Sequence, residues 1–264
     1  MSLKNLVLLS SLSLSLISGS ASATLLWVGD SNGNLGTVDT VSGNVNVIGN
    51  MGVTMTDIAF DSSGNLFGIS FTDLYSIDAS TATTSLIGSH SLSSTAKNSL
   101  VFGADGTLYA ANDSLFSLNT STGASTLIGN GGDSYDSSGD LAFIGAELFL
   151  SSTGGTGGDK LVQLDTANGV GSDVGDIGYS GVYGLATDNN VDLYGVAGTS
   201  VLSISTLTGV GSELLDYSGY GLGIAWGSAF YAEAGASVPE PSILALMSIG
   251  LIGLGFVGRK NKQA

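Results

Sequence analysis

Cysteine is absent from this chain of 264 residues, and histidine and arginine each occur once, as His90 and Arg259. Without cysteine the chain has no disulfides, no Cys/His nucleophile and no zinc site of the Cys/His type. A Ser/His/Asp system needs an oriented histidine. His90 lies in the polar stretch GSHSL, which predicts a surface-loop residue instead. Because arginine is confined to the tail, no bidentate clamp for phosphate or carboxylate precedes it.

Basic residues are nearly absent from the long middle of the chain. Between Thr24 and Val238, two lysines (Lys97 and Lys160) stand against 21 acids, which gives a net charge of −19. Such a surface repels phosphate backbones, so nucleic acid is excluded as a partner. This segment must be stabilised by its core alone, and it is long enough to bury one.

The N-terminus has the pattern of a secretory signal peptide. Lys4 precedes an apolar run from Leu6 to Ile17, and small residues then end in Ala21-Ser22-Ala23. A positive region, an apolar core and an A-x-A site predict cleavage after residues 1–23. A buried N-terminal helix is the alternative interpretation.

The C-terminus carries a second apolar run. Residues from Ile243 to Val257 are apolar apart from Ser248 and glycines. This is short of the roughly 17–25 residues that span a bilayer comfortably, but thinning of the membrane allows a marginal span. The basic tail residues are Arg259, Lys260 and Lys262. They predict a single apolar transmembrane helix with a cytoplasmic tail, rather than a core strand.

Proline occurs only as Pro239 and Pro241, directly before this run. The triplet Pro239-Glu240-Pro241, the apolar segment and the basic tail together resemble the PEP-CTERM sorting signal of Gram-negative bacteria. The resemblance implies processing by an exosortase, a membrane enzyme with a catalytic cysteine. It also implies export in a setting of exopolysaccharide and biofilm production. Because proline fixes φ and cannot join a ladder, the triplet is expected to stay extended; a helix N-terminus that tolerates proline is the alternative.

A short apolar motif recurs through the middle of the chain, as IAF, LVF, LAF, LAT and IAW. The motifs begin at Ile58, Leu100, Leu141, Leu185 and Ile224, in steps of 42, 41, 44 and 39 residues. Each has a small or β-branched middle residue, which suits a strand in the crowded centre of a radial array. Three further strand patterns separated by turn signals follow each motif, apart from the last.

Four antiparallel strands per repeat of this length predict an all-β fold, a five-bladed β-propeller of four-stranded blades. A β-sandwich and a β-solenoid are the competing architectures. The stretches LYSIDASTA and LFSLNTSTG resemble the LYxIDxxTG type of blade in quinoprotein-like repeat families, which implies a fold and no cofactor. The predicted domains are the signal peptide 1–23, the propeller 24–236 and the sorting segment 237–264.

The repeats do not start in phase, so the termini are expected to complete one blade together. The chain begins with a second strand from Leu25, and GIAWG from Gly223 is interpreted as the closing inner strand. Closure by the termini would leave no open edge in the ring. Residues 229–234 resemble a further second strand, and the sequence does not decide which second strand pairs in the ring.

Carboxylates are the remaining candidates for chemistry. Asp57 and Asp140 directly precede inner strands and could point toward the axis, as a pair of carboxylates would in a glycoside hydrolase. The alternative is a structural role at turns and strand ends. Calcium needs only oxygen ligands, and two clusters offer them. The weak metal candidates are Asp133, Asp136 and Asp140 in one cluster, with Asp188 and Asp192 in the other.

These patterns predict an exported, non-enzymatic protein of the cell surface or extracellular matrix that binds or scaffolds exopolysaccharide. The acidic, Ser/Thr/Gly-rich composition suits a hydrated environment, and its net charge opposes aggregation. A carbohydrate-active hydrolase or lyase that uses axial carboxylates is the alternative. No cofactor is expected, apart from the weak calcium candidates. Exosortase and extracellular polysaccharide are the expected partners, and the C-terminal segment is the expected membrane contact before processing.

Overall fold

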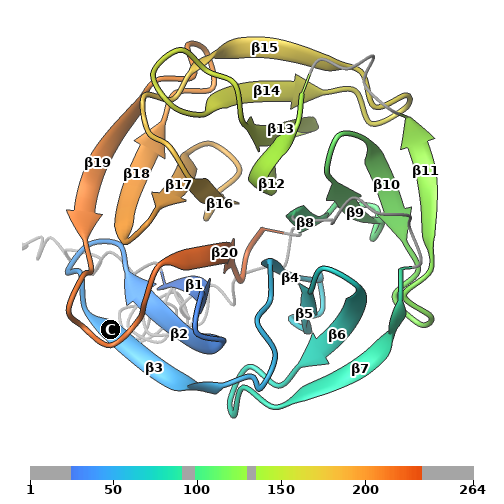
Figure 1. The fold of residues 1–264 in the computed structure, drawn as a ribbon, viewed down its shortest axis with the longest axis vertical. Helices are drawn as coiled ribbons and strands as arrows, with labels where there is room; N and C mark the ends of the chain where they lie inside the picture. The colour runs from blue at the N-terminus through green and yellow to red at the C-terminus, as the bar shows by residue number, and fades with distance from the viewer. Residues whose placement is uncertain (1–24, 91–98, 130–134, 234–264) are drawn as a thin grey trace, which may run out of the picture.

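A computed structural model describes residues 25–90, 99–129 and 135–233 of the chain, which form a ring of five sheets around a central axis (Figure 1). Each sheet has four antiparallel strands. Blade 1 contains β20 (Ala225–Phe230), β1 (Leu25–Asp30), β2 (Asn34–Asp39) and β3 (Val45–Asn50). Blade 2 contains β4 (Asp57–Phe60), β5 (Leu66–Ile69), β6 (Asp73–Ile77) and β7 (Thr84–Ser89).

The other three blades repeat the same order from the axis outward. Blade 3 contains β8 (Ser99–Phe102), β9 (Leu108–Ala111), β10 (Leu115–Leu118) and β11 (Ser125–Gly129). Blade 4 contains β12 (Ser137–Ile144), β13 (Glu147–Ser152), β14 (Lys160–Leu164) and β15 (Gly171–Asp176). Blade 5 contains β16 (Val182–Ala186), β17 (Leu193–Ala197), β18 (Ser200–Ile204) and β19 (Gly211–Asp216). The prediction of an all-β, five-bladed propeller with four-stranded blades is confirmed.

The predicted C-terminal apolar helix falls outside the described residues, as do the signal peptide and the sorting triplet. Within residues 25–90, 99–129 and 135–233, no helix has the length and apolar character needed to cross a bilayer.

Each inner strand places a small or β-branched residue opposite an aromatic residue of the second strand. The five pairs are Ala59–Phe67, Val101–Tyr109, Ala142–Phe149, Ala186–Tyr194 and Ala229–Trp27. Cross-strand neighbours of this kind lie about 4.5–5.5 Å apart, so the small side chain leaves room for the ring beside it. This pairing gives the repeat its constant middle position.

The same aromatic residues also join neighbouring blades. Four of the five pack on a phenylalanine of the next inner strand, with ring centroids 5.1–5.6 Å apart. The four pairs are Trp27–Phe60, Phe67–Phe102, Tyr109–Phe143 and Tyr194–Phe230. Tilted and edge-to-face contacts add about 0.5–1.5 kcal/mol to the burial of their area. Thr187 of blade 5 occupies the equivalent position of the fifth junction, so the aromatic series is interrupted there.

The termini close the ring, as predicted, but the closing strand is displaced from the motif that the sequence suggested. β20 pairs with β1, with Ala229 opposite Trp27. The true equivalent of the apolar motif is therefore Ser228-Ala229-Phe230, and the last repeat step is 43 residues instead of 39. The interpretation of GIAWG as that motif, and of residues 229–234 as a second strand, was wrong. The strand from Leu25 takes the second place in blade 1.

The turns between third and fourth strands place three aspartates and one asparagine at equivalent positions. Their side-chain oxygens accept backbone N–H bonds from the residue two positions later, at 2.8–2.9 Å. These residues are Asp39, Asp78, Asn119 and Asp165. The hydrogen bonds lower the pKa of Asp39 and Asp78, because they favour the charged carboxylate.

Glycine at the end of two outer strands permits close packing of adjacent blades. A Cβ atom on Gly88 would overlap the carbonyl group of Thr122, and one on Gly129 would overlap that of Asn168. The recurring Ile-Gly pair of the fourth strand thus lies where one blade contacts the turn between the third and fourth strands of the next blade.

Candidate functional site: the propeller axis

The residues that precede the apolar motifs of the five inner strands lie at equivalent positions around the axis. In chain order they are Asp57, Ser99, Asp140, Gly184 and Gly227. Both aspartates are completely buried. A Cβ atom on Gly227 would overlap Asp57, so glycine in blade 1 leaves the space that the carboxyl group of blade 2 occupies.

Backbone N–H groups hold the carboxyl group of Asp57. Its Oδ1 accepts the N–H of Ile58 at 2.7 Å, and its Oδ2 accepts that of Leu100 at 2.5 Å. Leu100 belongs to β8, so this side chain ties blade 2 to blade 3.

Asp140 repeats the arrangement on the other side of the axis. Its Oδ1 accepts the N–H of Leu141 at 2.6 Å, and its Oδ2 accepts that of Leu185 in blade 5 at 2.7 Å. It also accepts a backbone bond from Ser228 of blade 1, and its carboxyl group is hydrogen-bonded to Asp57. Together the two carboxyl groups therefore bond to the inner strands of all five blades.

This pair retains a proton at neutral pH. Burial and then the charge of Asp140 raise the pKa of Asp57 well above its usual value. Burial raises the pKa of Asp140 to about 8, against hydrogen bonds that favour its charged form. Two adjacent carboxyl groups without solvent cannot both ionise easily. Both carboxyl groups lie between inner strands of different blades, and the contacts they make join the blades.

A cavity of about 220 Å³ opens at the end of the axis where the inner strands begin. It is lined by residues of blades 1, 2, 4 and 5, namely Thr56, Phe71, Ser138, Gly139, Tyr183 and Trp226. Thr56 and Gly139 directly precede Asp57 and Asp140, so the buried pair lies next to the lining residues. We call this hollow the axial cavity.

Three aromatic side chains surround the axial cavity. Phe71, in the turn between β5 and β6, is 52% exposed, and its ring meets that of Trp226 edge to face at a centroid distance of 6.0 Å. Tyr183 and Trp226 are partly buried and belong to the first residues of β16 and β20. The sequence analysis missed these residues. Tyr183 and Trp226 were visible only as large side chains near the start of an inner strand, Trp226 was taken for part of the repeat motif, and Phe71 gave no signal in its turn.

The hydroxyl groups of Thr56 and Ser138 in the lining donate their hydrogens to the protein. Thr56 Oγ1 donates to the carbonyl of Ile69 at 3.0 Å. Ser138 Oγ donates at 2.5 Å to Oδ2 of Asp159, which also accepts the N–H of Val182 at 2.8 Å. Toward any further partner, each hydroxyl can only accept.

Another buried acid lies on the opposite face of the disc, where the inner strands end. Glu233 follows β20, and its Oε1 and Oε2 accept the N–H groups of Thr187 and Phe230 at 3.1 and 3.2 Å. Burial, with a smaller effect from the charge of Asp140, raises the pKa of Glu233 well above its usual value. Glu233 thus joins blade 1 to blade 5 beside Thr187.

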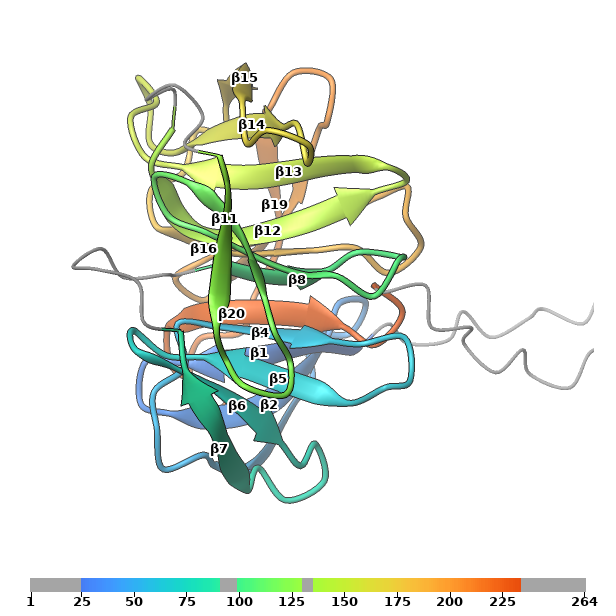
Figure 2. The same cartoon turned by 90° about the vertical axis from the view of Figure 1, so that its right-hand side faces the viewer.

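Both ends of the described propeller lie on this opposite face. Leu26 pairs with Phe230, so β1 begins where β20 ends. In Figure 2, β12 and β20 run in the same direction across the disc. Trp226 lies at the start of β20 and Glu233 beyond its end, so the axial cavity opens away from the point where the described chain ends.

His90 is buried, so its prediction as a surface-loop residue was wrong. Its Nε2 lies 3.4 Å from the carbonyl oxygen of Ser70, its backbone N–H donates to Thr72, and its carbonyl accepts from Ser125 of blade 3. The polar residues around His90 in the sequence suggested an exposed side chain, but these contacts place His90 between blades 2 and 3.

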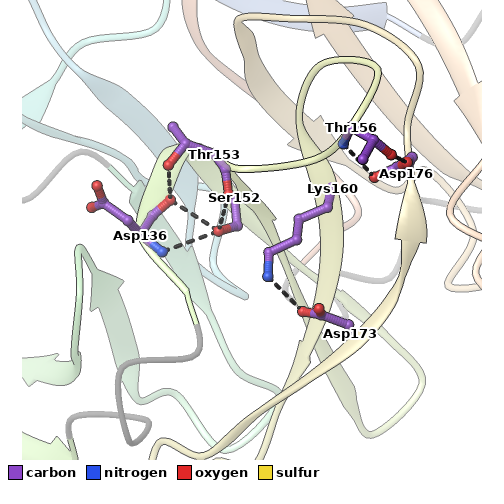
Figure 3. Close-up of polar contacts among 7 residues, drawn as sticks. All are labelled: Asp136, Ser152, Thr153, Thr156, Lys160, Asp173 and Asp176. Carbon is purple, nitrogen blue, oxygen red and sulfur yellow. Dashed lines mark hydrogen bonds and ion pairs between the residues drawn. The ribbon is translucent and has the colours of Figure 1, made fainter.

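The calcium candidates are not brought together by the described structure. Asp136 is exposed whereas Asp140 is buried at the axis, and Asp133 lies outside the described residues. The backbone of Asp136 bonds to Ser152 and Thr153, as Figure 3 shows. Asp192 accepts the side-chain N–H of Asn189 in a local turn. No group of three potential metal ligands forms among residues 25–90, 99–129 and 135–233.

Comparisons with known proteins identify the C-terminal segment and the fold. Residues 237–260 match the PEP-CTERM protein-sorting motif. A comparison with curated proteins gives no match. The motif marks an exported protein of Gram-negative bacteria that an exosortase sorts.

Solved structures share the propeller. A structural genomics protein of unknown function from Bacteroides thetaiotaomicron VPI-5482 aligns with a TM-score of 0.52 at 14% identity, over 74% of this chain and 58% of that chain. This chain therefore spans less than two thirds of that protein. A symmetrical protein described for its de novo evolutionary emergence aligns with a TM-score of 0.51 at 16% identity, over 80% and 95% of the two chains. At these identities the likeness shows the fold alone.

Proposed function

We propose that this exported protein, whose PEP-CTERM motif directs it to an exosortase, binds extracellular polysaccharide through its axial cavity without cleaving it. The observation that supports the proposal is the combination of three aromatic side chains with two hydroxyl groups around one small hollow. Aromatic faces pack against the apolar faces of sugar rings, and hydroxyl oxygens accept hydrogen bonds from sugar hydroxyl groups.

The size of the axial cavity favours one unit of a polymer. Its volume of about 220 Å³ lies below the range of about 300–1,000 Å³ that holds drug-sized molecules. A single sugar ring matches this volume better than an enclosed oligosaccharide, and the rest of the polymer would run over the rim at Phe71.

The burial of the axial acids supports binding without hydrolysis. A glycoside hydrolase needs an acid and a second carboxylate beside the scissile bond. Asp57 and Asp140 are both 0% exposed, and backbone N–H groups occupy both of their oxygens. Substrate would have to displace hydrogen bonds that join the blades.

The orientation of the propeller is consistent with a surface role. The axial cavity opens on the face opposite Glu233, after which the sorting motif follows in the sequence. A polymer at the cavity would therefore lie on the far side of the disc from the residue that leads to the sorting segment. We propose the cell surface or the extracellular matrix as the place where binding occurs.

A binding experiment with matched variants tests this function. Purified polysaccharide from a producing bacterium is titrated into wild-type protein, Trp226→Ala and, as a control, Tyr220→Ala, which removes an exposed ring outside the cavity. Trp226→Ala should weaken binding about ten-fold, equal to about 1.4 kcal/mol, whereas Tyr220→Ala should have no effect. Equal affinities of all three proteins would refute binding at the axial cavity. New reducing ends released by the wild type and lost in Asp140→Asn would favour the hydrolase instead.

A further inference from the structure

The described charged residues near the axial cavity are acidic. Among the described residues Lys160 is the one basic side chain, and its Nζ forms an ion pair with Asp173 at 2.7 Å (Figure 3). Lys160 belongs to β14, the third strand of blade 4, whereas the cavity is lined by inner strands and the turn at Phe71. No described cation therefore lines the cavity.

Acidic groups lie directly behind the lining. Asp159 is 6% exposed and accepts the hydrogen of Ser138 Oγ at 2.5 Å, so one hydroxyl separates this carboxylate from the cavity. Asp57 and Asp140 follow Thr56 and Gly139 in the chain and are completely buried. Because this pair retains a proton, the charges behind the lining are that of Asp159 and at most one from the pair, and burial in a medium of low dielectric strengthens their effect on a nearby ligand.

The hydroxyl groups of Thr56 and Ser138 suit a ligand that donates hydrogen bonds. Both have already donated their hydrogens, to Ile69 and Asp159, so their oxygens can accept from the hydroxyl groups of a sugar or from an ammonium group. Tyr183 and Trp226 add an O–H and an N–H donor to the lining, so charge and not hydrogen bonding separates neutral from anionic units.

From the lack of a described cation in the lining and the acids directly behind it, we infer that the axial cavity selects neutral or amino-bearing sugar units and rejects uronate and other anionic units. This inference rests on the proposed binding function and specifies the substrate class of the same cavity. It gives the acids behind the lining a role in specificity, because a like charge at the cavity would be repelled.

Three hexasaccharides of equal length test the inference on the full chain purified in detergent. Cellohexaose is the neutral probe, a glucosamine hexamer is the cationic probe, and hexagalacturonate is the anionic probe. Each is titrated into wild type and Trp226→Ala at low and moderate salt by calorimetry. The neutral or the cationic probe should bind the wild type and be weakened by the substitution. Hexagalacturonate should bind at least about ten-fold more weakly, with a difference that narrows as salt screens the charges.

A pair of variants at the exposed rim isolates the effect of charge from that of the aromatic ring. Phe71→Lys and Phe71→Gln both remove the ring, but only the first adds a cation. Phe71→Lys should bind hexagalacturonate more tightly than Phe71→Gln does. Equal affinities of the two variants for the anionic probe would overturn the inference.

The outcomes separate the inference from the proposed function. If no probe binds in a manner sensitive to Trp226→Ala, both fail. If hexagalacturonate binds the wild type as tightly as the neutral probe and is weakened by Trp226→Ala, the inference alone fails. Loss of that anionic binding in Lys97→Ala would overturn it too, and would assign anion recognition to the segment that precedes β8.

Discussion

Glu233 is expected to make the propeller less stable as the pH rises, and Glu233→Gln should remove this dependence. Both oxygens of this buried side chain accept backbone N–H bonds, from Thr187 and Phe230. Burial raises its pKa well above the usual value, so the folded state keeps its proton where the unfolded state has lost it. A group of this kind stabilises the fold fully below its unfolded pKa, and the contribution is lost as the pH rises toward the folded pKa.

The expected change in unfolding free energy follows from the titration of one proton. Above an unfolded pKa of about 4.3, each pH unit costs the wild type about 1.4 kcal/mol of unfolding free energy. This slope applies up to the folded pKa, where the loss of stability levels off. Glutamine does not titrate, but its NH₂ group cannot accept one of the two N–H bonds, which costs about 1–3 kcal/mol. Glu233→Gln should therefore be no more stable than the wild type at about pH 5, and its stability relative to the wild type should rise by about 1.4 kcal/mol for each further pH unit until the folded pKa is reached.

Urea unfolding at several pH values, followed by circular dichroism, measures both effects. The exposed Glu147→Gln provides the baseline for removal of one acidic residue. The informative quantity is the slope of unfolding free energy against pH, because Asp57 and Asp140 contribute in the same direction in every variant. If Glu233→Gln keeps the wild-type slope, Glu233 is already ionised in the fold and the reasoning is refuted.

Two further predictions concern the ends of the chain. Truncation after Ser218 removes β20, leaves β1 as an open edge and exposes the core that Phe230 fills. The unfolding transition should therefore move to a much lower urea concentration. A midpoint equal to that of the intact chain would contradict closure by the termini. In a host with an exosortase, the surface protein should begin at Thr24 and lack the segment from about Pro241 onward. Glu240→Ala should leave the precursor on the membrane. Measurement of the intact mass tests both, and a wild-type surface protein that keeps Arg259 would show that the tail is only an anchor.

Much of the fold could be predicted from the sequence, because a blade is a local structure. Strand, turn and strand follow within about 40 residues, and the turns have residues such as Asp78 whose side chains bond to their own backbone. The middle position of the inner strand was likewise visible as Ala59 or Ala142, since it must be small beside an aromatic neighbour. The sorting motif needs no folded context at all, and its match at residues 237–260 agrees with the prediction.

The pairing register of the last strand could not be predicted from its residue types alone. Ile224-Ala225-Trp226 has the same apolar pattern as the other motifs, but the ring selects Ser228-Ala229-Phe230. Only this register places Ala229 beside Trp27 and Gly227 against Asp57, where any side chain would overlap. Strand pairing with a segment almost 200 residues earlier in the chain decided the register, and local periodicity has no information about that partner.

The repeated blades, the excess of acidic residues and the C-terminal sorting motif could all be predicted from the sequence, because each depends on neighbouring residues or on composition. The tertiary structure decided the site. Asp57 and Asp140 are 83 residues apart and were each visible as a strand-end acid, but only closure of the ring makes them one buried pair that bonds to all five blades. Phe71, Tyr183 and Trp226 come from three different blades and share no spacing that a sequence could reveal. The rotation of each blade about the axis brings them together, and that rotation is set by packing between sheets.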